Sequence, residues 1–206
     1  MDTDEDGGRP TLKARLAQIP PAELTAEQRA LYDAILGGRR ASGHKGVSLT
    51  SASGALVGPF NVLLRSPALG EAIQRLGEEI RFGTTLAPRA REIVVLSVAA
   101  ASNSAFEWGA HEAIARIEGI SDGTIEDLRA RRKPTALAPD EEAAWGLARE
   151  LLATDALSDA GYAGGARALG ERGVLEVAAT VGYFRMIAGI LGAFAVGAPA
   201  DPSSER

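Results

Sequence analysis

Hydrophobic residues recur at helical spacing along most of the chain. In residues 66–83 the apolar positions lie three or four residues apart, which places them on one face of a helix. These positions are Leu69, Ile73, Leu76 and Ile80. Pro67 suits the first turn of such a helix. The pattern therefore predicts an amphipathic helix over this segment.

A second kind of segment is apolar on nearly every side. Residues 87–102, "APRAREIVVLSVAAAS", include an Ile-Val-Val run that would also suit a strand. The length of the segment, Pro88 near its start and its alanine-rich end favour a helix buried almost all round. Residues 104–119 continue with a second helix, which we expect to end at Gly119.

Capping residues mark several other helices. Thr25 and Gln28 form a capping-box signature, and two glycines at 37–38 end that helix. Ser121 begins a short amphipathic helix. Three more helices are predicted over 139–153, 158–170 and 173–196. With no internal repeat and no change of composition, these elements predict one all-α domain.

We expect the domain to span residues 21–198, between a flexible tail at 1–20 and another at 199–206. Residues 38–58 form a long segment rich in Gly and Ser, which contains His44. Loops of this length are uncommon inside a compact domain. We expect a loop that acts as a lid, binds a partner or is simply mobile.

Composition limits the chemistry. The 206 residues carry a formal net charge of −5, which argues against nucleic acid as a partner. The absence of cysteine excludes a thiolate nucleophile, a cysteine-ligated zinc and a cysteine redox cycle. The acidic N-terminus is unlike a secretory signal, and the longest apolar stretch, residues 186–200, is short for a membrane span. We therefore expect a cytoplasmic protein without a membrane partner.

The stretch "SNSAFEWGAHEA" contains the most informative side chains. Ser104, Glu107, Trp108 and His111 lie at i, i+3, i+4 and i+7, and therefore form one stripe on a helix beside its apolar face. Burial there raises the pKa of a carboxyl group, and an imidazole titrates near neutrality. The pair suits proton transfer.

Two other interpretations of this stripe stay open. Glu107 and His111 can simply bond to each other and fill the core. A metal site is the weaker alternative, because one histidine and one or two carboxylates make a thin ligand set and the H-E-x-x-H pattern is absent. We predict no metal.

Glu92 adds a carboxylate to the predicted buried helix. It lies early in that helix, where the helix dipole favours an anion, and the cations Arg89 and Arg91 precede it closely. A carboxylate in such a place needs a partner. A structural Arg–Glu ion pair and a catalytic role are about equally consistent with the pattern.

The spacing of these residues resembles that of the carboxymuconolactone decarboxylase family, whose superfamily includes the alkyl hydroperoxidase D peroxidases. The peroxidase branch has the pattern E-x11-C-x2-C-x3-H. Here Glu92 and His111 keep their places, whereas Ser104 and Glu107 stand where the two cysteines would be. The missing cysteines exclude the dithiol peroxidase mechanism.

In the decarboxylase branch the second helix typically resembles N-x-x-x-E-W-x-x-H, and Asn103, Glu107, Trp108 and His111 match it. The resemblance covers about residues 55–135 clearly and the later helices more loosely. It implies an all-α bundle that forms a homo-oligomer, often a trimer or hexamer. It also implies cofactor-free acid–base chemistry, such as decarboxylation, on a small carboxylated lactone or carbonyl substrate.

The resemblance also implies roles for single residues. His111 would be the general acid or base, Glu107 its partner or a second proton carrier, and Glu92 the group that orients His111. Candidate substrate-binding residues are Ser104, Asn103, Trp108, Arg185 and Tyr183. The alternatives are a helix cap for Asn103 and a buried ion pair for Arg185. A non-catalytic ligand-binding or scaffolding oligomer, and a metal-dependent enzyme, are the alternative functions.

Overall fold

The computed structural model describes residues 14–40 and 48–198. Within these ranges the chain forms helices and no strand, apart from one isolated β-bridge between Thr50 and Leu56. The predicted all-α class is confirmed. The elements are η1 (Pro21–Glu23), α1 (Ala26–Gly37), α3 (Gly58–Leu63), α4 (Pro67–Phe82), α5 (Pro88–Ser102), α6 (Ala105–Ile117), α7 (Asp122–Arg129), α8 (Pro139–Thr154) and α9 (Asp159–Ala193).

The helix ends agree with the capping residues in the sequence. Gln28 N–H donates to Thr25 Oγ1, and Thr25 N–H donates to Gln28 Oε1, so the capping box of α1 is formed. Ser121 accepts from the backbone N–H of Thr124 at the start of α7. Gly119 has φ +80 after α6, in the left-handed region that glycine adopts readily.

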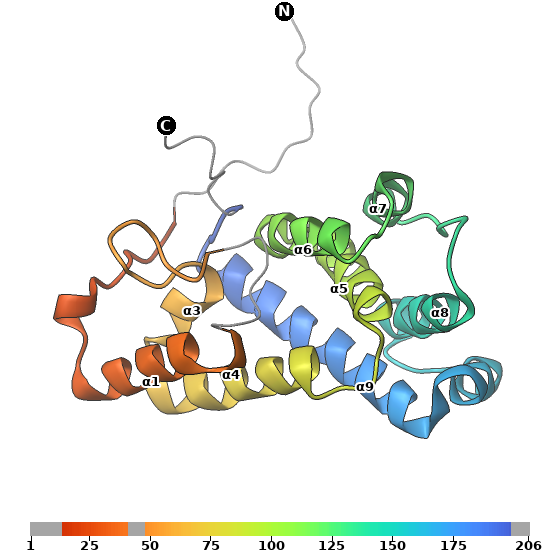
Figure 1. Ribbon diagram of the computed structural model, residues 1–206, viewed down its shortest axis with the longest axis horizontal. Helices are drawn as coiled ribbons and strands as arrows, with labels where there is room; N and C mark the ends of the chain where they lie inside the picture. Colours follow the sequence, from red (N-terminus) through yellow and green to blue (C-terminus); the bar gives the residue numbers. More distant parts are fainter. Residues whose placement is uncertain (1–13, 41–47, 199–206) are drawn as a thin grey trace, which may run out of the picture.

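The two predicted C-terminal helices are one run with a break. Gly170 has φ 71 and ψ 167 inside α9, which no helical residue adopts. The predicted boundary between the two helices is therefore real, although the second helix starts without an intervening loop. Figure 1 shows α9 running the length of the molecule, with α1, α3 and α4 toward one end and α7 and α8 toward the other.

Helix α5 is the buried centre of the fold. It packs against α6, α7, α8 and α9, and most of its side chains are inaccessible to solvent, as the sequence predicted. One hydrophobic cluster joins its residues Val94 and Val98 to α8 and α9. Another joins Ile93 and Leu96 to Trp108 and α7. Glu92 is thus carried on the least exposed helix of the molecule.

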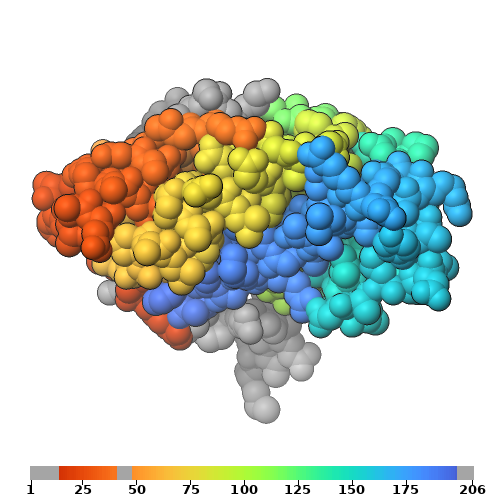
Figure 2. All heavy atoms as spheres, turned by 90° about the horizontal axis from the view of Figure 1, so that it is seen from below, coloured from red at the N-terminus to blue at the C-terminus, as the bar shows by residue number. Residues whose placement is uncertain are grey.

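Helix α4 lies at the surface, and only two of the four apolar residues that define its predicted face are buried. Ile73 and Ile80 are buried, but Leu69 and Leu76 are 59% and 46% exposed. The buried positions beside the two isoleucines include Gly70, Gln74 and Gly77. Figure 2 shows α4 between α1 and the C-terminal half of α9 on one face of the molecule. Small residues on α4 therefore allow close approach of its neighbours.

The described part of the N-terminal segment is bound to the rest of the fold. Asn61 Nδ2 donates to the carbonyl of Ala17, and Ile19 N–H donates to Asn61 Oδ1. Arg15 N–H donates to the carbonyl of Phe194 near the other end of the chain. Residues 15–19, which the sequence analysis placed in a flexible tail, are therefore held by these polar contacts and by the packing of Ile19 against the core.

The predicted loop at 38–58 is only partly described. Residues 48–57 lie around the bridge between Thr50 and Leu56, and Leu56 is fully buried. Helix α3, which the sequence analysis did not predict, starts at Gly58 and is too short to show a clear apolar period. His44 lies outside the described residues.

By length and composition alone, α9 could cross a membrane. Its most apolar window of 18 residues has a mean hydropathy of 1.6, and no other helix among the described residues reaches this level. However, 44% of that window is buried inside the protein. The core helix of a folded domain has the same features, so this observation is weak evidence for a membrane span.

Candidate active site

A cavity lies between α3, α4, α5, α6 and α9. Most of its wall is apolar. Its ionisable lining residues are Arg40, Arg81, Arg91, Glu92, Glu107, His111 and Tyr183. The structure thus brings four of the predicted site residues, Glu92, Glu107, His111 and Tyr183, to one cavity.

His111 and Glu92 form a hydrogen-bonded pair between α6 and α5. His111 Nδ1 lies 2.7 Å from Glu92 Oε2. The carboxylate is 1% exposed, and the imidazole side chain is 13% exposed. An ionised Glu92 requires the proton to be on Nδ1, which leaves Nε2 on the other side of the ring for a bound molecule. The contact between Glu92 and His111 has the geometry that an orienting role requires.

Two arginines stabilise the negative charge of Glu92. Arg91 Nε lies 3.7 Å from Glu92 Oε1, and Arg81 adds a second positive charge from α4. Burial opposes the charged carboxylate, but His111, Arg81 and Arg91 together hold the pKa of Glu92 below its usual value. The structural Arg–Glu ion pair and the contact with His111 therefore coexist.

Glu107 has a different environment one turn before His111. It is 3% exposed, and neither of its carboxyl oxygens has a hydrogen-bond partner among residues 14–40 and 48–198. Burial raises the pKa of Glu107 to about 8, and the nearby Ser104 hydroxyl offsets only a small part of this rise. At neutral pH Glu107 is therefore a neutral carboxylic acid that lines the cavity.

Glu107 and His111 do not bond to each other, although they share a helix face. The hydrogen bond of His111 goes to Glu92 on another helix. Besides Glu107, only Arg91 Nε among the described residues is a buried side-chain polar atom without a hydrogen-bond partner. Both residues line the same cavity. Because native structures leave few such groups unpaired, this cavity has the polar groups expected of a binding site.

Arg40 and Tyr183 meet at Gly77 on another wall. A Cβ atom on Gly77 would lie 2.2 Å from the Tyr183 hydroxyl and 2.7 Å from Arg40 Nη2, so only glycine leaves room for them. Arg40 Nη1 donates to the backbone carbonyl and to Oε1 of Gln74. Burial raises the pKa of Tyr183 to about 12, so its phenol stays protonated.

Aromatic and aliphatic side chains complete the lining. The Phe184 ring contacts the His111 ring edge to face, with centroids 5.0 Å apart. The Phe106 ring lies so near Gly58 that a Cβ there would come within 2.1 Å of it. Leu49, Val57, Phe60, Val95 and Ile187 also contribute. This apolar surface limits the access of water to Glu107 and His111.

Trp108 is not a wall of this cavity, contrary to the sequence prediction. One residue along a helix turns the side chain by about 100°, so Trp108 points away from the direction of Glu107. It packs with Ile93 and Leu96 in another cluster. Its Nε1 donates to Glu112 Oε2, and Arg129 lies over its ring.

Asn103 and Ser104 also lie outside the lining. Asn103 has φ 50 at the C-terminal end of α5, and its Oδ1 accepts from Arg131 Nη2. Asn103 is therefore the C-cap residue of α5. A helix cap was the alternative to substrate binding that the sequence analysis gave for this residue. Ser104 occupies the N-cap position of α6 without a capping hydrogen bond from its side chain.

Arg185 is likewise outside the cavity. Its Nη1 binds Asp155 in an exposed ion pair, because its position on α9 points it toward the end of α8. Tyr183, two residues earlier, faces the opposite way and is buried. Three other arginines line the cavity instead: Arg40, Arg81 and Arg91. The sequence analysis assigned none of them to substrate binding.

Among the described residues, no group of three or more histidine and acidic side chains is arranged to hold a metal ion. The chemistry of the cavity comes from a carboxylic acid, a histidine–carboxylate pair, a phenol and three guanidinium groups. Such a set suits proton transfer on an anionic molecule.

Residues 67–150 match the sequence model of the Carboxymuconolactone decarboxylase family. This segment runs from α4 to α8 and includes Glu92, Glu107 and His111. None of the curated proteins matches the chain. The predicted resemblance to this family is thereby confirmed for the segment that carries these three residues.

Solved structures share the fold at low identity. An uncharacterized peroxidase-related protein from Ralstonia eutropha, with an alkylhydroperoxidase AhpD core, has a TM-score of 0.72 and 17% identity over 94% of this chain and 95% of its own. A peroxidase-related protein from Silicibacter sp. gives 0.66 and 16% over 91% and 92%. The debrominase Bmp8, in complex with 2,3,4-tribromopyrrole, gives 0.69 and 14% over 93% and 97%.

Proposed function

We propose that this chain, whose residues 67–150 match the sequence model of the carboxymuconolactone decarboxylase family, is a cofactor-independent acid–base enzyme. Its substrate is a small carboxylated lactone or carbonyl compound. The reaction is decarboxylation or a related proton transfer. The observation that carries this proposal is Glu107, a buried carboxylic acid without a partner among the described residues, in the cavity that also contains His111.

Glu107 is the general acid in this proposal. Its pKa of about 8 keeps it protonated near neutral pH, so it can deliver a proton to a carbon or oxygen of the substrate. In a decarboxylation, the bond to the leaving carboxylate breaks and its electron pair forms an enolate as carbon dioxide departs. Glu107 then protonates that enolate and regains a proton from solvent.

His111 is the second proton carrier. Glu92 fixes its ring through the 2.7 Å contact to Nδ1, so that Nε2 is the nitrogen available to the substrate. The imidazole can accept a proton where the reaction begins with deprotonation and return it later. Glu92 is a positioning residue, because it acts through His111.

The cavity favours an anion. Arg40, Arg81 and Arg91 supply three positive charges against one ionised carboxylate, Glu92. The Nε of Arg91 is in an ion pair with Glu92 but makes no hydrogen bond among the described residues. It can therefore donate to a substrate carboxylate. The apolar wall strengthens each of these interactions by excluding water.

The fold by itself does not select one reaction. The debrominase Bmp8 has a similar fold at 14% identity, so the fold is compatible with more than one chemistry. The proposal of proton transfer therefore depends on the side chains in the cavity of this chain.

The test uses a panel of small carboxylated lactones and β-keto acids. Release of carbon dioxide and uptake of deuterium from D₂O are measured for the wild type, Glu107→Gln and His111→Ala. We expect each variant to lose at least about 10²-fold in turnover, the usual contribution of a positioned acid or base. Glu126→Gln, at an exposed site on α7, is the matched control. Unchanged turnover in both site variants overturns the proposal.

A non-catalytic ligand-binding oligomer is the alternative. It predicts that members of the panel bind but that no deuterium enters them at any pH. The homo-oligomer, the lack of a cofactor and the cytoplasmic location stay predictions.

A further inference from the structure

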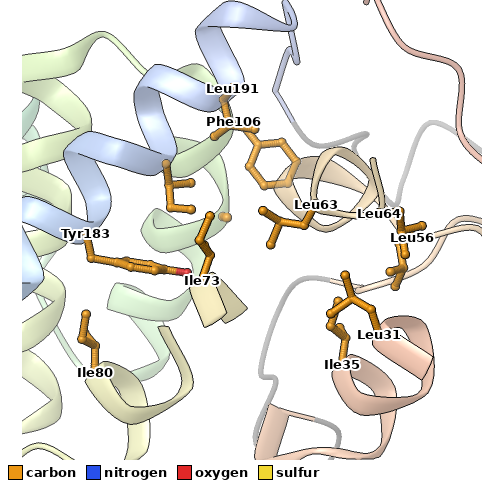
Figure 3. Close-up of a cluster of buried hydrophobic side chains, with 12 residues drawn as sticks. Leu31, Ile35, Leu56, Leu63, Leu64, Ile73, Ile80, Phe106, Tyr183 and Leu191 are labelled. Atoms are coloured by element: carbon orange, nitrogen blue, oxygen red, sulfur yellow. The ribbon is translucent and has the colours of Figure 1, made fainter. Parts of the chain in front are cut away.

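Arg40 and Tyr183 reach the cavity from parts of the chain on either side of the family segment. Arg40 follows α1, and Tyr183 lies on α9, whereas the family match spans residues 67–150. Figure 3 shows the Tyr183 ring extending from α9 toward α4, with its hydroxyl end near Ile73. Both residues contact α4 at Gly77, whose missing side chain is the reason that they fit.

The charge of Arg40 is only partly neutralised. The residue is 5% exposed, and its closest carboxylate oxygen in the described structure, on Glu78, is 4.0 Å away. Gln74 accepts from Nη1, and the guanidinium lies over the Phe60 ring at 5.4 Å. None of the hydrogen bonds of the described residues uses Nη2, the nitrogen beside Gly77. Because Arg40 lines the cavity, this nitrogen can donate to an anionic ligand there.

The Tyr183 hydroxyl is a second donor at the same place. None of the hydrogen bonds among the described residues involves it, although the residue is 9% exposed. It remains a phenol at neutral pH, because burial makes its ionisation unfavourable. Tyr183 lines the cavity, so a bound molecule that offers an oxygen acceptor can take a hydrogen bond from this hydroxyl.

We propose that Arg40 Nη2 and the Tyr183 hydroxyl form an oxyanion-binding pair that stabilises the enolate oxygen of the substrate during proton transfer. This inference rests on the proposed function, because an enolate forms only if the cavity catalyses proton transfer or decarboxylation. The pair forms no covalent bond with the substrate and transfers no proton to it. It donates two hydrogen bonds, one of them charged, to the oxygen on which negative charge develops while Glu107 or His111 exchanges a proton with the neighbouring carbon.

The experiment uses 4-nitrophenol, a planar apolar molecule whose phenolate oxygen resembles an enolate oxygen. Its ionisation is followed by phenolate absorbance against pH, with protein in excess. We expect the pKa of the bound phenol to be about 1 unit or more below that of the free phenol, because a close cation favours the charged form. Tyr183→Phe and Arg40→Gln are each expected to lose most of this shift. Tyr162→Phe, at an exposed tyrosine, and Arg185→Gln are the matched controls.

The outcomes separate this inference from the proposed function. In Glu107→Gln the proposed acid is absent, but the phenolate shift is expected to persist. A shift that survives Tyr183→Phe and Arg40→Gln overturns the pair, and so does a wild type that leaves the phenol unshifted or unbound. Unchanged substrate turnover in Glu107→Gln and His111→Ala would overturn the proposed function alone.

Folding is checked by thermal melting for each variant. If Arg40→Gln does not fold, Arg40→Lys replaces it in the experiment. This variant keeps the positive charge, and it is expected to retain part of the shift in the pKa of the phenol. Tyr183→Phe removes a single oxygen and therefore tests the hydroxyl with little change in packing. On an identified substrate it is expected to lower kcat by about 10²-fold and to leave KM nearly unchanged, as for an oxyanion donor.

Discussion

His111 Nδ1 on α6 lies 2.7 Å from Oε2 of Glu92 on α5, and the two residues are 19 positions apart in the sequence. The contact joins the most buried helix of the fold to the helix that contains Glu107. It determines both the orientation of the imidazole and which ring nitrogen faces the cavity.

Glu92→Gln is predicted to destabilise the protein at neutral pH by about 3 kcal/mol, because it leaves Arg91 and His111 near a neutral amide in a buried place. The pKa of Glu92 is lowered in the folded state, so its ionisation stabilises the fold above the ordinary pKa of 4.5. This stabilisation is lost as the pH falls through the lower, folded-state pKa. Urea unfolding at pH 7 and pH 3 should show a smaller difference between variant and wild type at pH 3.

Glu126→Gln on α7 is the control for that comparison, since the Glu126 side chain is 64% exposed. It should change the free energy of unfolding by less than about 0.5 kcal/mol. An equal stability of Glu92→Gln and wild type at pH 7 would show that the buried pair contributes nothing to the fold.

Glu107→Gln is predicted to stabilise the protein increasingly as the pH rises. The folded-state pKa of Glu107 is about 8 and the ordinary value is 4.5. Between these values the folded protein keeps a proton that the unfolded chain has lost, so the wild type loses stability as the pH rises. Glutamine has no such cost. The difference in the free energy of unfolding should therefore grow by about 1.4 kcal/mol per pH unit between pH 5 and pH 8.

The measurement is denaturant unfolding of Glu107→Gln and wild type at pH 5, 6.5 and 8. A constant difference over this range would mean that Glu107 titrates normally in the folded protein. The variant should meanwhile lose the proton-transfer activity of the wild type, so stability and activity change in opposite directions.

Gly77→Ala is predicted to destabilise the fold by about 1–3 kcal/mol through overpacking. The new methyl group would come 2.2 Å from the Tyr183 hydroxyl, a contact that forces the ring to move. Gly146→Ala on α8 is the matched control, because nothing lies within 4 Å of a Cβ atom there. That control should gain about 0.5–1 kcal/mol from helix propensity. Adding Tyr183→Phe to Gly77→Ala should recover part of the loss in thermal melting.

Arg91→Gln is predicted to weaken the binding of benzoate, a small apolar carboxylate, by about tenfold, because it removes a charged donor from the cavity. Arg185→Gln should leave the affinity unchanged, since Arg185 pairs with Asp155 outside the cavity. Titration calorimetry with both variants measures the difference. Equal affinities would remove Arg91 from the anion site.

Local sequence signals were enough to predict every α-helix of the described residues except α3. The capping box at Thr25, the glycine after α6 and the N-cap at Ser121 act within one turn, so the sequence shows them directly. Helix α3 was missed because six residues are too few to establish a period. The shared face of Glu107 and His111 was likewise predictable, since it follows from one helix.

The rest of the site depends on contacts between distant segments. Arg40 is 143 residues from Tyr183 in the chain, and their meeting at Gly77 depends on the packing of α4 and α9. The sequence has no spacing that links the three. Arg81 lies four residues after Gly77 and therefore shares the part of α4 that Gly77 buries, but the spacing of apolar residues does not indicate it.

The sequence analysis placed four side chains in one stripe on α6, but only Glu107 and His111 line the cavity. Ser104, Glu107, Trp108 and His111 span an arc that includes the border between two clusters. Which part of the arc faces the cavity is decided by the position of α5 and α9, and no property of α6 alone shows it. Trp108 therefore lies on the far side of the border.

The break at Gly170 divides α9 into two parts, and only the second part lines the cavity. The part after the break carries both Tyr183 and Phe184. A change in the direction of this part at Gly170 would therefore move the phenol and the ring that contacts His111 together. A substitution at position 170 would therefore change the geometry of this cavity wall from a position that does not line the cavity.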